Sequence, residues 1–103
     1  MTTQILREPS VEHIRLATQM LKLASDPTRL KILWALLHGE HSVNELAEHV
    51  GVQPAAVSQH LAKLRMAKLV NVTREGNKLF YKATDKYMRK IAENALLYAN
   101  ASA

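Results

Sequence analysis

The stretch that decides the fold runs from Val43 to Val70 and reads VNELAEHVGVQPAAVSQHLAKLRMAKLV. Its apolar residues recur at helical spacing, but Gly51 and Pro54 interrupt the pattern three residues apart. Glycine adopts the left-handed conformation that ends many helices, and proline is favoured at the first position of a helix. The stretch therefore predicts two short helices, over residues 43–50 and 54–67, joined by a tight turn.

The sequence before this stretch predicts two more helices. Residues 1–9 are expected to form a flexible arm, after which Ser10 can cap a helix over residues 10–24. Asp26-Pro27 combines a capping residue with proline at the first helical position, so a second helix is predicted over residues 27–38.

After Lys68 the helical periodicity ends. Two runs rich in β-branched and aromatic residues, over 69–73 and 79–82, flank a turn that contains Gly76. This pattern is typical of a β-hairpin. A last helix with regularly spaced apolar residues is predicted over residues 85–99.

Two helices joined so tightly form a helix-turn-helix, here residues 43–67, and the hairpin over 69–82 would be its wing. An α-helix is about 10–12 Å across and fits the DNA major groove, which is about 12 Å wide. We therefore predict one winged helix-turn-helix domain over residues 10–103, mainly α with a β-hairpin wing, in the order α-α-α-α-β-β-α.

Charge supports a polyanionic partner such as double-stranded DNA. The chain has 14 Lys and Arg residues against 9 Asp and Glu residues, a net charge of +5, and the positive charges concentrate after residue 62. Polar and basic side chains along the second helix of the pair are suited to the bases, and later basic ones to phosphates. The residues predicted for the groove are Gln53, Ser58, Gln59, His60 and Lys63, and those for phosphates are Arg65, Arg74 and Lys78.

Other function classes find little support. The absence of cysteine excludes disulfides and thiolate metal sites. No apolar run reaches the roughly 20 residues that span a membrane, and the N-terminus lacks the apolar segment of a secretory signal, so a cytoplasmic protein is expected. Because no phosphate loop, zinc-protease motif or nucleophile elbow occurs, we expect no enzymatic activity.

Four segments resemble successive blocks of the arsenic-repressor (ArsR/SmtB) family of bacterial winged-helix regulators, in particular its actinobacterial nickel/cobalt sensors. They are LASDPTRLKIL, SVNELAEHVG, VSQHLAKLRMAKLV and REGNKLFYKAT, and the resemblance covers about residues 20–85. It implies a homodimer formed by the first and last helices, which binds an imperfect palindrome and is released by an inducer ion. The family's Ser-x-His-Leu pattern falls on residues 58–61.

The chain departs from this family in two places. Pro54-Ala55-Ala56 replaces hydroxyl and amide residues that many members carry at the start of the reading helix. At positions that match the metal ligands of the last helix, the chain has Asp85, Tyr87, Tyr98 and Ala101, of which only Asp85 could bind a metal. The usual metal site of the last helix is therefore not expected here.

Dimerisation is also expected without the resemblance. One reading helix gives limited affinity, whereas two related by a twofold axis, about 34 Å apart, contact two half-sites. The apolar faces of the helices predicted over 10–24 and 85–99 are broader than a short monomer needs, and they are the expected interface.

Three interpretations stay open: two concern the regulatory input and one concerns DNA binding itself. His13 of one subunit could meet Asp85 or Glu93 of the other and bind nickel, cobalt or zinc as an effector, although no cofactor is required. The input could instead be a partner protein or a small molecule. A third interpretation, favoured by Pro54-Ala55-Ala56, is an interaction module that no longer binds DNA.

The remaining histidines have plain alternatives to metal binding. His49 follows Glu45 by one helical turn, a spacing that also suits a solvated helix surface. His38 and His41 flank Gly39 at a helix C-terminus, where histidine is favoured by the helix dipole.

Overall fold

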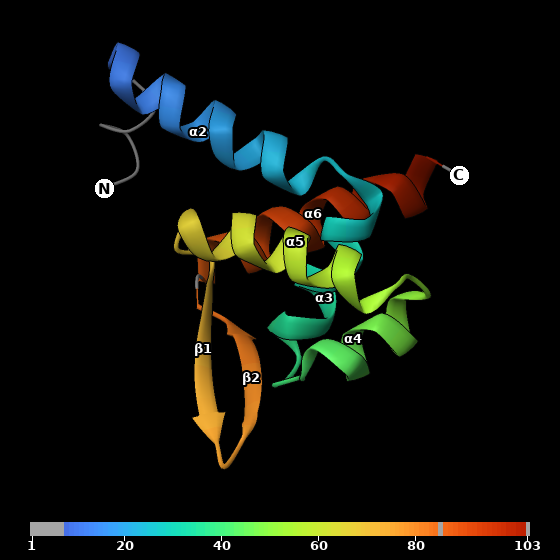
Figure 1. Ribbon diagram of the computed structural model, residues 1–103. Helices are drawn as coiled ribbons and strands as arrows, with labels where there is room; N and C mark the ends of the chain where they lie inside the picture. The colour runs from blue at the N-terminus through green and yellow to red at the C-terminus, as the bar shows by residue number, and fades with distance from the viewer. Residues whose placement is uncertain (1–7, 85, 103) are drawn as a thin grey trace.

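The computed structural model describes residues 8–84 and 86–102, so most of the predicted arm and Asp85 lie outside it. Within these residues the predicted winged helix-turn-helix and its order of elements are confirmed (Figure 1). The predicted boundaries hold to within three residues. The elements are α2 (Val11–Ala24), α3 (Pro27–Leu37), α4 (Val43–Val50), α5 (Pro54–Met66), β1 (Val70–Glu75), β2 (Lys78–Ala83) and α6 (Lys86–Ser102).

The turn between α4 and α5 has the geometry that its residues predict. Gly51 has φ 82°, in the left-handed region, and its N–H donates to the Ala47 carbonyl at 2.8 Å. Ser42 and Glu45 form both hydrogen bonds of a capping box at the start of α4. Pro54 opens α5, where a missing N–H removes no helical hydrogen bond.

The C-terminus of α3 receives one local and one tertiary side-chain hydrogen bond. The helix ends at Leu37, one residue before the predicted end, and His38 is its capping residue. The His38 ring bonds the Trp34 carbonyl at 2.7 Å, and Arg89 of α6 donates to the Leu37 carbonyl. Side chains thus satisfy carbonyls that the end of a helix leaves without partners.

The hydrophobic core lies where α3, the helix-turn-helix, the start of β1 and α6 meet. Leu46 and Ala47 of α4 share one buried cluster with three residues of α5, as the apolar pattern predicts. The buried residues of α5 are Val57, Leu61 and Leu64.

The hairpin extends away from the helices, at the end of the molecule opposite α2 (Figure 1). Its strands are antiparallel and longer than predicted, pairing from Val70 with Ala83 to Glu75 with Lys78. Two backbone hydrogen bonds between His41 and Tyr81, at 3.0 and 2.8 Å, join β2 to the loop before α4. The base of the wing is therefore fixed to the helix-turn-helix.

Helix α2 lies along the outside of the fold (Figure 1) and contains no buried residue. Only Met20, Leu23 and Ala24, near its C-terminus, pack against the core. Several of its apolar side chains are exposed, with Val11 at 87%. No helix in the part of the chain that the structure describes is long and apolar enough to cross a membrane.

Candidate nucleic-acid interface

The reading helix α5 divides into an inner and an outer side. Val57, Leu61 and Leu64 are buried, so the positions between them face outward. Ser58, Gln59 and Lys63 are exposed on α5, and Gln53 is exposed just before it. Because α4 supports α5 from below through the buried cluster, these polar side chains are presented on a rigid helix. Their contact with bases stays a prediction.

His60 lies differently from the other predicted groove residues. It is half-buried, and its Nδ1 is 3.3 Å from the Nη1 of Arg29 in α3. One edge of the His60 ring therefore faces Arg29, and the predicted contact of His60 with DNA stays a prediction. The reason is helical geometry: His60 is three residues after Val57 and four before Leu64, so it borders the inner side of α5.

Arg29 is a functional candidate that the sequence pattern did not single out. Its backbone N–H donates to the Asp26 carboxylate at 2.9 Å, which lowers the pKa of that carboxyl below its usual range. Partial desolvation opposes this shift, and the positive charge of Arg29 adds to it. A cation in the first turn of a helix is disfavoured by the helix dipole, so the position itself signals a compensating partner.

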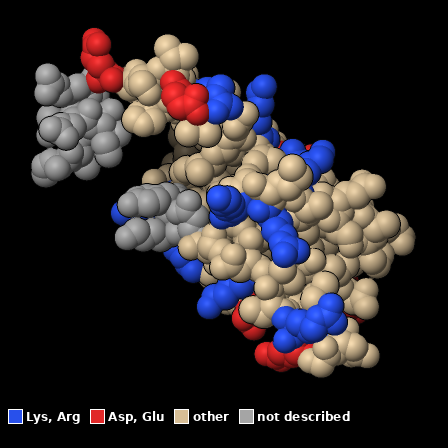
Figure 2. All heavy atoms as spheres, turned by 60° about the vertical axis from the view of Figure 1, so that its left-hand side comes forward, with Lys and Arg blue, Asp and Glu red and all other residues tan. Residues whose placement is uncertain are grey.

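Basic side chains lie along one face of the molecule. Figure 2 shows Lys and Arg side chains in a band down this face, with acidic side chains near its upper and lower ends. The predicted phosphate contacts Arg65, Arg74 and Lys78 are all exposed. A band of this kind supplies the sequence-independent attraction that DNA-binding proteins need.

The two predicted phosphate contacts of the wing, Arg74 and Lys78, point to opposite faces of the hairpin. Arg74 pairs with Leu79, and Lys78 pairs with Glu75 in the next register position. Since successive side chains alternate across a strand, Arg74 and Lys78 emerge on different sides. A wing entering a groove edge-on would therefore direct one cation toward each wall.

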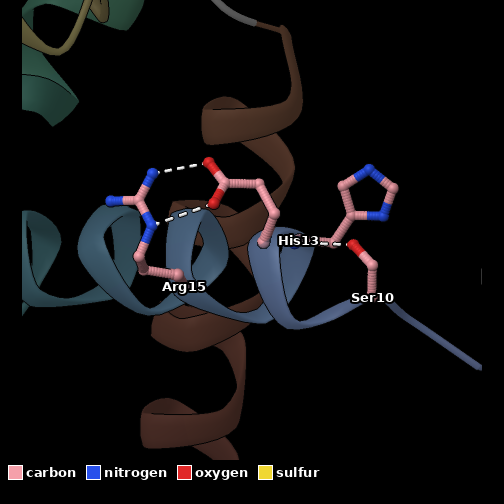
Figure 3. Close-up of polar contacts among 4 residues, drawn as sticks. Ser10, His13 and Arg15 are labelled. Carbon is pink, nitrogen blue, oxygen red and sulfur yellow. Dashed lines mark hydrogen bonds and ion pairs between the residues drawn. The ribbon is translucent and has the colours of Figure 1, made fainter.

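His13 and Glu93, the two predicted metal ligands that the structure describes, each take part in local contacts. His13 is exposed in the first turn of α2, and its ring points away from the ion pair of Glu12 and Arg15, whose Nη2 and Oε2 are 2.5 Å apart (Figure 3). Its backbone N–H donates to the Ser10 hydroxyl at 3.0 Å. Glu93 Oε2 lies 3.7 Å from Arg89 Nη1, and Asp85 is outside the described residues. Among residues 8–84 and 86–102 no three His, Asp or Glu side chains form a group that could hold a metal ion.

The other histidines take part in local contacts. His41 Nδ1 is 3.8 Å from the Glu45 carboxylate, and its ring stacks on His49 with centroids 6.4 Å apart. Glu45 therefore pairs with His41, not with His49 as the helical spacing allowed. The bond of His38 to the Trp34 carbonyl agrees with the capping alternative.

The comparisons with known proteins agree with this geometry. Residues 26–72 match the model of the family described as "Bacterial regulatory protein, arsR family". The chain is also 42% identical over 88 residues to the HTH-type transcriptional regulator KmtR of Mycobacterium tuberculosis, covering 85% of this chain and 68% of that protein. The protein belongs to the ArsR family. The actinobacterial source of this relative agrees with the resemblance drawn from the sequence.

Solved structures support the same assignment for the fold. The crystal structure of NolR from Sinorhizobium fredii has a TM-score of 0.78 at 32% identity, covering 87% of this chain and 93% of that one. The structure of the AntR antimony-specific transcriptional repressor has a TM-score of 0.85 at 27% identity, covering 94% of this chain and 89% of that one.

Family membership establishes the general function. The protein is a DNA-binding transcriptional regulator and not an enzyme, as the sequence predicts. The match over residues 26–72 runs from the N-cap of α3 into β1 and so contains the whole helix-turn-helix.

Proposed function

We propose that the protein is a homodimeric repressor that binds a palindromic operator and acts in the cytoplasm, where bacterial DNA lies. The observation that carries this proposal is the uneven distribution of apolar surface. The helix-turn-helix buries most of its large apolar side chains within the chain and exposes Met66 at the end of α5, whereas α2 and α6 each expose several, including Val11 at 87% and Tyr98 at 75%. A second copy is the partner that would cover both helices at once. Repression is supported by the likeness to AntR, itself a repressor.

Each subunit would place α5 in the major groove of one half-site. Gln59 and Gln53 can form paired hydrogen bonds with adenine, Ser58 can donate or accept, and Lys63 can bind guanine or phosphate. The apolar first turn, where Pro54 and Ala55 are exposed, would contact thymine methyl groups. Family membership argues against the alternative of an interaction module that does not bind DNA.

A metal ion is the proposed effector, with nickel, cobalt and zinc as the candidates that histidine and carboxylate ligands suit. The site would join His13 of one subunit to Asp85 and Glu93 of the other. Metal binding there would have to displace the Arg89 guanidinium from Glu93, 3.7 Å away. An effector that prefers one arrangement of the dimer would then shift the spacing of the two reading helices.

A metal-independent regulator that responds to a partner protein or a small molecule is the second candidate. It is favoured by the lack of a three-ligand group among the described residues of one chain and by the engagement of Glu93 with Arg89.

Operator selection tests the DNA-reading part of the proposal. The wild-type protein is used to select duplexes from a random pool, and its mass in solution is measured alone and on the selected duplex. We expect a dimer and a selected sequence with two inverted half-sites. Gln59→Ala should change the preferred base within each half-site. A monomer that selects a single unrepeated site would contradict the proposal.

Metal titration separates the two candidate inputs. Nickel, cobalt and zinc are each titrated by calorimetry into the wild-type protein and into His13→Ala, and then into the mobility-shift assay. The metal-linked candidate predicts stoichiometric binding that is lost in His13→Ala and that lowers DNA affinity. Binding that leaves DNA affinity unchanged would show that metal is not the inducer and would favour the second candidate.

A further inference from the structure

The Arg29 guanidinium connects three helices. Its Nε donates to the Leu23 carbonyl in the last turn of α2 at 2.7 Å, and its Nη1 lies 3.3 Å from His60 Nδ1 in α5. Arg29 itself stands in the first turn of α3, where its backbone N–H binds the capping Asp26. Arg29 is half-buried. Its two side-chain contacts join the exposed outer helix α2 to the reading helix α5.

The direction of α2 depends on contacts at its C-terminal end. No residue of α2 is buried, and the three that pack against the core lie within its last five positions. The Leu23 carbonyl is one of the four that the end of a helix leaves without a helical partner, and a cation there also complements the helix dipole. Arg29 therefore fixes the point about which α2 would tilt.

The contact between Arg29 and His60 fixes the rotation of α5 about its own axis. His60 lies between the predicted groove residues Gln59 and Lys63, so a turn of α5 that moves His60 also moves them. Nδ1 can accept from Arg29 only when the ring proton is on Nε2. The donors of a guanidinium lie in one rigid plane, which ties the direction of the bond to His60 to that of the bond to Leu23.

We propose that Arg29 is a positioning residue that couples the orientation of α2 to that of α5 and thereby sets sequence specificity. It does so without contacting DNA. The inference rests on the proposed function, because α2 matters for specificity only if it lies in the dimer interface. A tilt of α2 within the dimer would be passed through Arg29 to His60 and to the neighbouring groove residues.

Substitutions at both ends of the contact test this coupling. Arg29→Met keeps the apolar stem and removes the side-chain donors, and Lys31→Met is the control that removes one charge from the same helix at an exposed position. His60→Leu removes the acceptor, whereas His60→Asn keeps an acceptor close to the position of Nδ1. Each variant is assayed for unfolding midpoint, for dimer mass and for affinity to a duplex selected by the wild-type protein and to a scrambled duplex of equal length.

The measured quantity is the ratio of selected to scrambled affinity. We expect Arg29→Met and His60→Leu to lower this ratio by about tenfold or more, the loss typical of one hydrogen bond to a charged group. Lys31→Met should lower both affinities alike, and His60→Asn, which keeps the acceptor, should retain a higher ratio than His60→Leu. The Arg29→Met/His60→Leu double variant should be no worse than the poorer single variant, since both remove the same bond.

Several outcomes would overturn the inference. An Arg29→Met ratio equal to that of Lys31→Met, or losses that multiply in the double variant, would show no coupling. If Arg29→Met does not fold, the two His60 variants decide, and His60→Asn as poor as His60→Leu would assign His60 to direct DNA contact instead. A wild-type protein that selects no duplex would overturn the proposed function itself, and this inference with it.

Discussion

The helix-turn-helix and α2 are both amphipathic, but only the helix-turn-helix packs most of its apolar face against other parts of the same chain. In α4 and α5 most large apolar side chains reach the core, with Leu61 only 1% exposed, and Met66 at the end of α5 is the exception. In α2 the apolar positions face outward over most of the helix, and Leu16 is 48% exposed. The helix-turn-helix therefore holds its shape within one chain, whereas α2 leaves apolar side chains uncovered, which the proposed second subunit would cover.

The same substitution in both regions gives the largest expected contrast. Leu61→Ala leaves a cavity in the core and should lower the free energy of unfolding by about 2–5 kcal/mol. Leu16→Ala is the matched control, because a half-exposed side chain has less burial to lose, and it should cost less than about 1 kcal/mol in the monomer. Denaturant unfolding at low protein concentration measures both. Equal losses would show that α2 is packed within the monomer.

A charge on the exposed face of α2 should separate subunits without unfolding them. Leu21 is exposed, so Leu21→Glu should leave the helical circular dichroism unchanged. If it costs about 1 kcal/mol in each of two symmetric copies, the dimer dissociation constant should rise roughly 30-fold. Sedimentation measures this, with Gln19→Glu as the control that adds the same charge to another exposed position of α2. An unchanged dissociation constant would remove α2 from the interface.

The wing should contribute affinity but little sequence preference. Arg74→Gln and Lys78→Gln should each weaken binding to all duplexes and reduce the slope of log affinity against log salt by about 0.9 per lost phosphate contact. Glu75→Gln, a change of the opposite charge at the same tip, should strengthen binding. If neither basic substitution changes the slope, Arg74 and Lys78 do not bind phosphates.

The smallest expected effect lies at Asp26, between the two regions. The folded chain lowers the pKa of this carboxyl, so folding favours its ionised form. The resulting stabilisation is complete above the ordinary Asp range, about pH 4, and is lost as the pH falls through the lowered value. The stability advantage of the wild type over Asp26→Asn should therefore shrink on acidification from pH 7 in denaturant unfolding. An advantage independent of pH would contradict the assigned cause.

The candidate site was predicted in part. The exposed positions Ser58 and Gln59 of the reading helix follow from helical spacing alone, because the buried positions on either side of them, Val57 and Leu61, are apolar. The contact of His60 with Arg29 does not follow from helical spacing, since a polar residue at the border of a helix face can lie on either side. The pairing of Glu45 with His41 instead of His49 depends on the path of the loop before α4.

The sequence by itself determined the elements and their ends: Gly51 and Pro54 set the tight turn, Ser42 and Glu45 the start of α4, and Gly76 the tip of the wing. These are local effects of backbone conformation and capping, which act within a few residues. Only the tertiary structure decided the role of Arg29, because Leu23 and His60 come within reach of its guanidinium only when α2, α3 and α5 are packed together.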